Sequence, residues 1–282
     1  MIFQEKLDKI VVKNKSLVCV GLDSDVKKIP EHLKIKENAV FEFNKAIVDA
    51  THDLVCAYKP KSAFYEANGD EGLKQLKLTF DYINKTYPEI ITILDAKRAD
   101  IGNTNNGYIK YAFDWLNADG ITLHPYLGRE ALKPFLERAD KASIILCRTS
   151  NKGAGEFQDL QIQSLSRHDR TKIVKPLYQI VAENVAKKWN KNKNCMLVVG
   201  ATYPDELKEV RKIVGDMTFL VLGVGAQGGD VEKTVKAGLN SKGSGMIINS
   251  SRGIIFASSG PDFAEVARRE AIKLKEEINK YR

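Results

Sequence analysis

Residues 90–100 of the chain read IITILDAKRAD. Ile90 to Leu94 are apolar or β-branched without alternation, which is typical of a strand buried on both faces of a parallel sheet. Asp95 and Lys97 follow, two positions apart and so on one side of a regular strand, and Asp100 comes just past the expected strand end. An isolated Asp-x-Lys-x-x-Asp pattern is also compatible with a surface salt-bridge cluster. Charges at the mouth of a buried strand need partners or a function, so we place the chemistry here.

Seven more apolar runs of this kind occur along the chain. They lie at residues 17–22, 54–58, 120–123, 143–147, 195–199, 218–222 and 245–248. Helix-compatible segments lie between or after them, at 70–87, 102–117, 129–141, 170–190, 205–214 and 261–281. Eight strands alternating with helices predict an α/β protein with one closed (β/α)₈ barrel, the TIM barrel, and a doubly wound open sheet is the competing architecture. No linker divides the chain, so we expect one domain over residues 1–282.

Composition excludes several classes of protein. Hydrophobic residues make up 43% of the chain, and no run approaches the roughly 20 apolar residues that cross a bilayer. The N-terminal residues mix acids with bases, unlike a secretion signal, so we expect a cytoplasmic protein without a membrane partner. The net charge of +8 is scattered over helical segments, which favours small anionic ligands over nucleic acid.

The four cysteines, Cys19, Cys56, Cys147 and Cys195, each lie in an apolar run, and no two form a Cys-x-x-Cys pair. A buried thiol behaves as a small apolar side chain. We therefore expect reduced, buried cysteines and neither a disulfide framework nor a zinc site.

Further charged residues stand where other strands end. In a (β/α)₈ barrel the catalytic groups project from the C-terminal strand ends. Lys59 ends the second strand and can alternate with Asp95, Lys97 and Asp100, so that each charge has an opposite neighbour. Asp23 follows the first strand, where an aspartate is also a common helix cap.

Two loops predict a phosphate site. Residues 223–230 read GVGAQGGD after the seventh strand, and residues 249–253 read NSSRG after the eighth. Glycines let backbone N–H groups approach an anion, and Arg252 can bind it with two hydrogen bonds, although tight turns with a surface arginine explain the same pattern. Thr149 and Ser150 close the fifth strand and offer hydroxyl groups to a polar ring or simply to the backbone.

The segment 151–169 is long for a connection from strand to helix. It is rich in Gly, Gln and Ser. We interpret it as a loop or lid on the active side of the barrel, with a tolerated insertion as the alternative.

Together these segments resemble orotidine 5′-phosphate decarboxylases, specifically the longer, type 2 subfamily. The resemblance spans nearly the whole chain through SLVCVGLD (16–23), YKPKSAFYE (58–66), LDAKRADIGNT (94–104), RTSN (148–151), GVGAQGGD (223–230) and SSRGI (250–254). The Asp-x-Lys-x-x-Asp pattern alone also occurs in sugar-phosphate decarboxylases and hexulose-phosphate synthases of the same superfamily. The full set in this order is more specific.

This resemblance implies a carboxy-lyase that converts orotidine 5′-monophosphate to uridine 5′-monophosphate and CO₂, the last step of de novo pyrimidine synthesis, without metal or cofactor. Lys97 would donate the proton to the carbon that loses the carboxylate, Asp95 would lie beside that carboxylate, and Lys59 would hold the charges in place. The resemblance also implies a homodimer with shared sites and these contacts: Asp23 with ribose, Thr149 and Ser150 with pyrimidine, Gln227 and Arg252 with phosphate, and Asp100, Ile101 and Thr104 with the site of the partner subunit.

One position departs from the expected pattern, and two other functions stay open. Lys61 stands where longer-subfamily relatives usually carry Asn or Gln, which adds a positive charge beside the expected ribose site if the side chain points inward. A Mg²⁺-dependent sugar-phosphate decarboxylase or aldolase is the alternative enzyme. A non-catalytic nucleotide- or RNA-binding protein is the alternative from another class, but acids at the rim and the lack of an aromatic-interleaved basic stripe argue against it.

Overall fold

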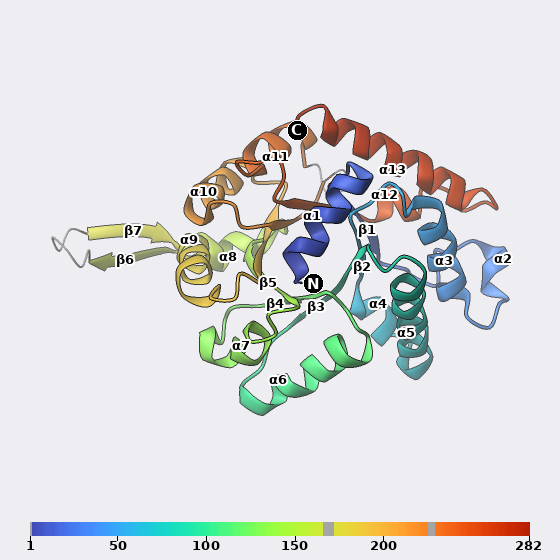
Figure 1. Ribbon diagram of the computed structural model, residues 1–282, viewed down its shortest axis with the longest axis horizontal. Coiled ribbons are helices and arrows are strands. Elements are labelled where there is room, and N and C mark those ends of the chain that lie inside the picture. The colour runs from blue at the N-terminus through green and yellow to red at the C-terminus, as the bar shows by residue number, and fades with distance from the viewer. Residues whose placement is uncertain (1, 166–171, 225–228) are drawn as a thin grey trace.

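The computed structural model describes residues 2–165, 172–224 and 229–282. Within these residues, eight parallel strands close into a barrel in the order β1-β10-β9-β8-β5-β4-β3-β2 (Figure 1). The strands are β1 (Val18–Leu22), β2 (Ala57–Pro60), β3 (Ile91–Arg98), β4 (Gly120–Leu123), β5 (Ala142–Arg148), β8 (Cys195–Gly200), β9 (Phe219–Leu222) and β10 (Met246–Ser250). The predicted (β/α)₈ barrel is confirmed, and the open sheet is excluded.

Helices surround the barrel (Figure 1). They are α1 (Phe3–Asn14), α2 (Glu31–Lys34), α3 (Ala39–Thr51), α4 (Ser62–Glu66), α5 (Gly69–Thr86), α6 (Gly102–Ile109), α7 (Gly128–Leu136), α8 (Gly155–Gln158), α9 (Leu177–Asn184), α10 (Pro204–Val214), α11 (Val231–Gly238), α12 (Arg252–Ile255) and α13 (Phe263–Asn279). A π-helical turn extends α6 over Lys110–Trp115 and another extends α9 over Val185–Trp189. All of these helices except α8 have buried residues, and the strand residues are almost all buried, so the core is continuous from barrel to helices.

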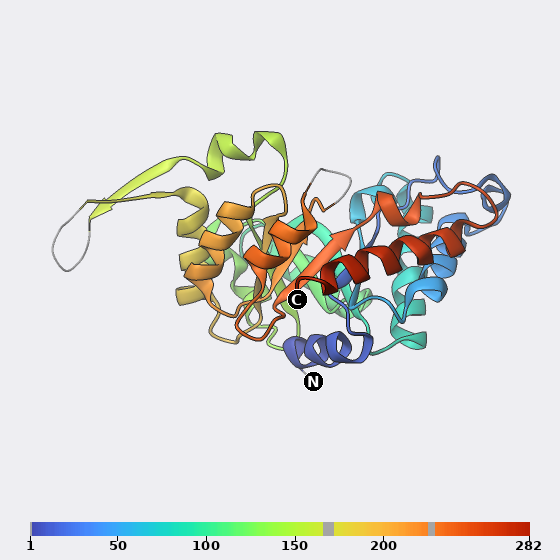
Figure 2. The same cartoon turned by 90° about the horizontal axis from the view of Figure 1, so that it is seen from above.

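Helix α1 lies across the N-terminal end of the barrel (Figure 2). The Lys6 ammonium lies 2.7 Å from the carboxylate of Asp119, which precedes β4. The Thr218 hydroxyl, which precedes β9, donates to the side chain of Gln4 over 2.9 Å. Helix α1 is thus anchored to the residues that precede β4 and β9.

Three predicted elements differ from the structure. The helix predicted over 129–141 is α7, which already ends at Leu136. The second strand begins at Ala57 and not at Leu54, because the apolar residues before it are buried but pair with β1 only from Cys56 onward. The helix expected over 170–190 begins only at Leu177, after the strand β7 (Lys172–Pro176). Pro176 explains the late start, because proline has no N–H and disfavours helix in the residue before it.

The segment 151–169 divides into two parts. A 3₁₀ turn (Lys152–Ala154) and α8 stay near the barrel, whereas β6 (Gln161–Leu165) pairs antiparallel with β7. This hairpin projects away from the barrel (Figures 1 and 2). The described part of the hairpin therefore does not cover the strand ends as a lid, and only the first part of the segment lies on the active side.

All four cysteines lie in the described part of the chain and are buried with free thiols, as expected. Burial raises the pKa of Cys19, Cys147 and Cys195 to about 12. They therefore stay protonated and act as apolar side chains. No helix among the described residues is long and apolar enough to cross a membrane.

Candidate active site

A cavity of about 480 Å³ opens at the C-terminal ends of the strands. Four of its side chains are cationic and two are carboxylates, so the cavity suits an anion. The lining residues are Asp23, Lys59, Lys61, Asp95, Lys97, Leu146, Thr149, Ser150, Asn151, Gln158, Leu222, Gly223, Val224, Asn249, Ser250, Ser251 and Arg252. Most of the predicted site residues are thus brought together at the ends of five strands.

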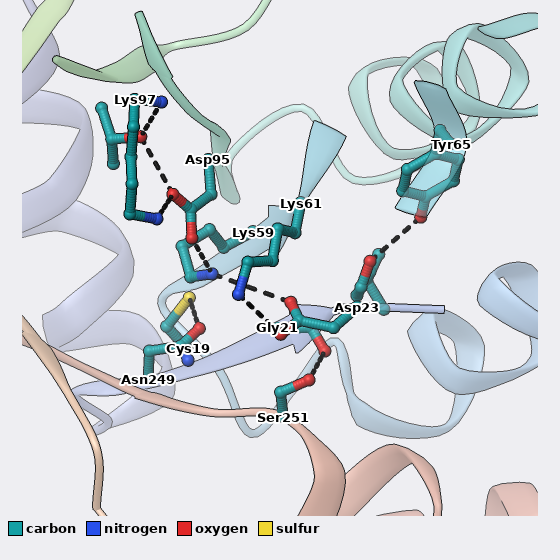
Figure 3. Close-up of polar contacts among 12 residues, drawn as sticks. Cys19, Gly21, Asp23, Lys59, Lys61, Tyr65, Asp95, Lys97, Asn249 and Ser251 are labelled. Carbon is teal, nitrogen blue, oxygen red and sulfur yellow. Dashed lines mark hydrogen bonds and ion pairs between the residues drawn. The ribbon is translucent and has the colours of Figure 1, made fainter. Parts of the chain in front are cut away.

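Asp95 lies between two lysines at the floor of the cavity (Figure 3). Its Oδ2 accepts a hydrogen bond from Lys59 Nζ over 2.9 Å, and its Oδ1 accepts one from Lys97 Nζ over 2.5 Å. The side chains of Lys59 and Asp95 are 2% exposed, but that of Lys97 is 39% exposed. The buried pair is therefore fixed, while the Lys97 ammonium remains accessible from the cavity.

Electrostatics keep the buried pair ionised. Burial alone would raise the pKa of Asp95, but the attraction of Lys59 and Lys97 outweighs it and holds this pKa well below its usual range. Burial would likewise lower the pKa of Lys59, but the charges of Asp95 and Asp23 outweigh it and raise that pKa. The floor of the cavity is thus a set of fixed charges near neutral pH.

Asp23 carries an acceptor that the protein leaves free. Its carboxylate lies 3.9 Å from Lys59 Nζ and 3.7 Å from Lys61 Nζ, both beyond hydrogen-bond distance (Figure 3). Asp23 Oδ1 is buried and accepts no hydrogen bond from any described group. A buried acceptor without a donor is costly. The Asp23 side chain as a whole is 17% exposed and lines the cavity, so the carboxylate can accept a hydroxyl of a ligand there.

Lys61 points into the cavity, and its side chain is 37% exposed. The additional positive charge that its sequence position suggested is therefore present beside Asp23. Together with Lys59 and Lys97, it is one of three lysines that line the cavity (Figure 3).

Lys97 reaches Asp95 through an irregular strand. The pairing of β3 with β4 shifts between Leu94 and Arg98, and Lys97 adopts a left-handed φ of 49°. Asp95 and Lys97 therefore meet as predicted, but the strand that brings them together is irregular and does not alternate regularly. Thr122 in β4 accepts the Lys97 N–H over 2.9 Å and donates to Asp95 Oδ1 over 3.0 Å. Sequence reasoning missed Thr122 because it looks like any other residue of a buried strand.

The loops after β9 and β10 form one wall of the cavity. Gly223, with a left-handed φ of 92°, lines it, and Arg252 lines it from the start of α12. Gly229 N–H donates to Gly223 O over 3.1 Å, which ties the two described ends of this loop together. Gln227, the other predicted phosphate contact, lies outside the described residues.

Thr149 and Ser150 line another part of the cavity, after β5. The Thr149 N–H donates to Gln158 Oε1 over 2.8 Å, and Gln158 Nε2 donates back to the Thr149 hydroxyl over 2.9 Å. Gln158 belongs to α8 and itself lines the cavity. It was missed because it lies in a connection and not at a strand end, and we find no signal in the sequence that singles it out.

Asp100, Ile101 and Thr104 are not brought into this cavity. The Asp100 N–H donates to Asn105 Oδ1 over 2.9 Å, and its own carboxylate accepts from the Ile101 N–H over 2.7 Å. Ile101 is 64% exposed, and Thr104 is exposed in α6. Within one chain the predicted group of four charges is therefore a group of three, and the role of Asp100 stays a prediction.

The donor set of the cavity favours anions over metal ions. Among the described residues, no three His, Cys, Asp or Glu side chains are grouped so that they could hold a metal ion. Of the two cavity carboxylates, Asp95 already has a lysine on each oxygen. The remaining polar groups are hydroxyls, amides and cations, which suit a phosphorylated, hydroxylated ligand.

Comparison with known proteins gives one consistent result. Residues 16–268 match the family described as orotidine 5′-phosphate decarboxylase / HUMPS. The chain is 50% identical over 281 residues to an orotidine 5′-phosphate decarboxylase of Cellvibrio japonicus, covering 99% of this chain and 98% of the relative. It is 47% identical over 282 residues to one of Ralstonia pickettii, covering 100% of both. The solved structure of Leishmania donovani OMP decarboxylase superposes with a TM-score of 0.84 at 38% identity, covering 100% of this chain and 99% of that chain.

Proposed function

The chain belongs to the orotidine 5′-phosphate decarboxylase / HUMPS family, and on that premise we propose that it converts orotidine 5′-monophosphate to uridine 5′-monophosphate and CO₂. This carboxy-lyase reaction is the last step of de novo pyrimidine synthesis. The observation that carries the proposal is the Lys59–Asp95–Lys97 array, in which a partly exposed ammonium faces an anion-binding cavity beside a buried carboxylate.

Lys97 is the proton donor in the proposed reaction. The bond from the pyrimidine ring to the carboxylate carbon breaks, CO₂ leaves, and the electron pair stays on the ring carbon. A proton moves from Lys97 Nζ to that carbon, and the lysine regains a proton from water. A fixed ammonium stabilises the developing negative charge and then supplies the proton, so no electron-accepting cofactor is required.

Asp95 orients Lys97 in this proposal. Its carboxylate is ionised, buried and hydrogen-bonded to both lysines, which supports a fixed donor direction more directly than it supports a purely repulsive role. Lys59 balances the charge of Asp95 and approaches Asp23.

The rest of the substrate follows from the walls of the cavity. We assign ribose hydroxyls to Asp23, whose carboxylate lines the cavity and is partly exposed there. We assign the pyrimidine edge to Thr149 and Ser150, and the phosphate to Arg252 together with Gln227. Phosphate binding far from the reacting carbon would supply binding energy that is used in the transition state.

We also propose a homodimer in which Asp100, Ile101 and Thr104 complete the site of the partner subunit. Apolar residues on two neighbouring loops support a contact surface there. Ile101 in the loop after β3 is 64% exposed, and Tyr126 and Leu127 in the loop after β4 are 87% and 43% exposed. Large exposed apolar side chains that gather on adjacent loops are typical of an interface.

An ultraviolet assay of orotidine 5′-monophosphate loss, with and without EDTA, tests the function. We expect full turnover in EDTA. Loss of turnover in EDTA that Mg²⁺ restores would favour a metal-dependent lyase, whose enediolate intermediate a metal ion stabilises. No turnover with salt-sensitive RNA binding would favour the non-catalytic alternative.

A further inference from the structure

We propose that Thr122 is a positioning residue that holds Lys97 at both its backbone and its ammonium group, an inference that rests on the proposed function of Lys97. Thr122 is fully buried in β4 and is not among the residues that line the cavity. It therefore cannot touch the substrate and acts only through its neighbours.

The pairing of β3 with β4 shows why a side chain is needed here. Leu94 pairs with Ile121 and Arg98 pairs with Leu123, so three residues of β3 lie opposite Thr122 alone. Such a bulge removes backbone partners from the strand. The Lys97 N–H donates over 2.9 Å to the Thr122 hydroxyl, which takes the place of a backbone carbonyl.

This hydrogen bond supports an unfavourable backbone conformation. Lys97 has a φ of 49°, in the left-handed region that a β-carbon disfavours. Such a residue keeps its conformation only where the surrounding structure holds it, and such residues cluster at functional sites. The Thr122 hydroxyl is the group that holds it from β4.

The same hydroxyl also fixes the other end of Lys97. Because its oxygen accepts the Lys97 N–H, its single proton is directed to Asp95 Oδ1, 3.0 Å away. That carboxylate oxygen accepts the Lys97 ammonium over 2.5 Å. Thr122, Asp95 and Lys97 thus form a closed ring of hydrogen bonds that determines where the proton donor lies.

Three variants test this role. Thr122→Val keeps the shape but removes both hydrogen bonds, Thr122→Ser keeps them, and Thr92→Val is a matched control. Thr92 is also a fully buried threonine whose hydroxyl lies 3.3 Å from a carboxylate, that of Asp119, but at the opposite end of the barrel.

We expect Thr122→Val to lower kcat by about 10- to 100-fold, as for loss of a hydrogen bond to a charged group, with KM changed by less than about threefold. Thr122→Ser and Thr92→Val should stay within about threefold of wild type in kcat.

Amide hydrogen exchange gives a readout that does not depend on the reaction. The Lys97 amide should exchange faster in Thr122→Val than in wild type, Thr122→Ser or Thr92→Val, because its acceptor is gone. If Thr122→Val does not fold, Thr122→Ala is used in its place. We expect the same result from it, a lower kcat with little change in KM.

Three results would overturn the proposal: an unchanged kcat in Thr122→Val, equal losses in the valine and serine variants, or a fall in kcat matched by an equal loss of uridine 5′-monophosphate affinity. Absence of turnover in the wild-type protein would instead refute the proposed function, and hydrogen exchange would still test whether Thr122 holds Lys97.

Discussion

A threonine, an aspartate and a lysine meet at each end of strands β3 and β4, but the two clusters are built differently, and the lysine at the N-terminal end comes from α1. At the N-terminal end, Asp119 Oδ2 lies 2.7 Å from Lys6 Nζ, 2.9 Å from the Thr92 amide and 3.3 Å from the Thr92 hydroxyl. One carboxylate oxygen thus holds the start of a strand and anchors α1.

At the C-terminal end, the aspartate contacts side chains on both of its oxygens. Lys59 and Lys97 each take one oxygen of Asp95, and Thr122 joins Lys97 on Oδ1. Here the lysine backbone is left-handed and the ammonium faces a cavity. The same kinds of residue therefore form a structural anchor at one end of the barrel and a candidate reactive group at the other. The two clusters differ in backbone strain and in access to a cavity.

Replacing the lysine of each cluster should separate them most strongly. Lys97→Ala removes the proposed acid and should lower kcat by at least about 10²- to 10⁴-fold, the usual contribution of general acid catalysis. Lys6→Ala removes a partly buried ion pair at the N-terminal end of the barrel, outside the cavity, and should leave kcat unchanged. Steady-state kinetics with circular dichroism as a check of folding measures both. Near-normal turnover in Lys97→Ala would show that the C-terminal cluster, like the N-terminal one, has a structural role and no catalytic role.

The contacts of the N-terminal cluster all lie within one chain. Mixed dimers test whether the site at the C-terminal cluster also requires residues of a second chain. Lys97→Ala and Asp100→Ala should each be nearly inactive. After subunit exchange, activity should recover to about one quarter of wild type, since half of randomly formed dimers are mixed and each holds one intact site. Exchange verified by mass spectrometry without recovery would contradict a composite site.

The barrel could be predicted from sequence because its signal is local and repeated. Each strand is a short apolar run, and burial on both faces requires that pattern. The rule that chemistry lies at C-terminal strand ends then placed Asp23, Lys59, Asp95 and Lys97 in one cavity.

The remaining features depend on contacts that the sequence does not show locally. Thr122 matters because the bulge in β3 lies opposite it, and nothing in the run GITL at 120–123 shows that bulge. Gln158 reaches Thr149 only because the connection after β5 folds back before the hairpin begins. Pro176, by contrast, is a local signal for a helix boundary, and the prediction of a helix over 170–190 overlooked it.

Arg252 tests whether the cavity above the C-terminal cluster binds phosphate. Arg252→Ala should lower kcat/KM by about 10- to 100-fold, mainly through KM, because a charge-assisted hydrogen bond to the anion is lost. Arg138→Ala is a matched control, since this arginine pairs with Asp114 outside the cavity. Binding of uridine and its 5′-monophosphate by calorimetry should show that only the nucleotide loses affinity. An unchanged kcat/KM would argue against the assignment.

Acid unfolding probes the buried carboxylate of the C-terminal cluster directly. The pKa of Asp95 is lowered in the folded protein, so its contribution to stability is present above the unfolded pKa of about 4 and is lost as the pH falls below it. The free energy of unfolding of the wild-type protein should therefore fall more steeply below about pH 4 than that of Asp95→Asn. Urea unfolding at several pH values measures the two slopes, and equal slopes would show that Asp95 is not ionised preferentially in the fold.

The smallest effect is expected at Lys61, the cavity lysine outside the two clusters. Its side chain is 37% exposed, and its ammonium lies 3.7 Å from Asp23 Oδ2, so solvent and salt screen the pair. Lys61→Gln, which restores a residue type that the resemblance leads us to expect, should change kcat/KM by less than about threefold. It should also weaken the dependence of KM on salt, because one cation near the anionic substrate is removed. A loss above about tenfold would instead mean that Lys61 contacts the substrate itself and belongs with Lys59 and Lys97.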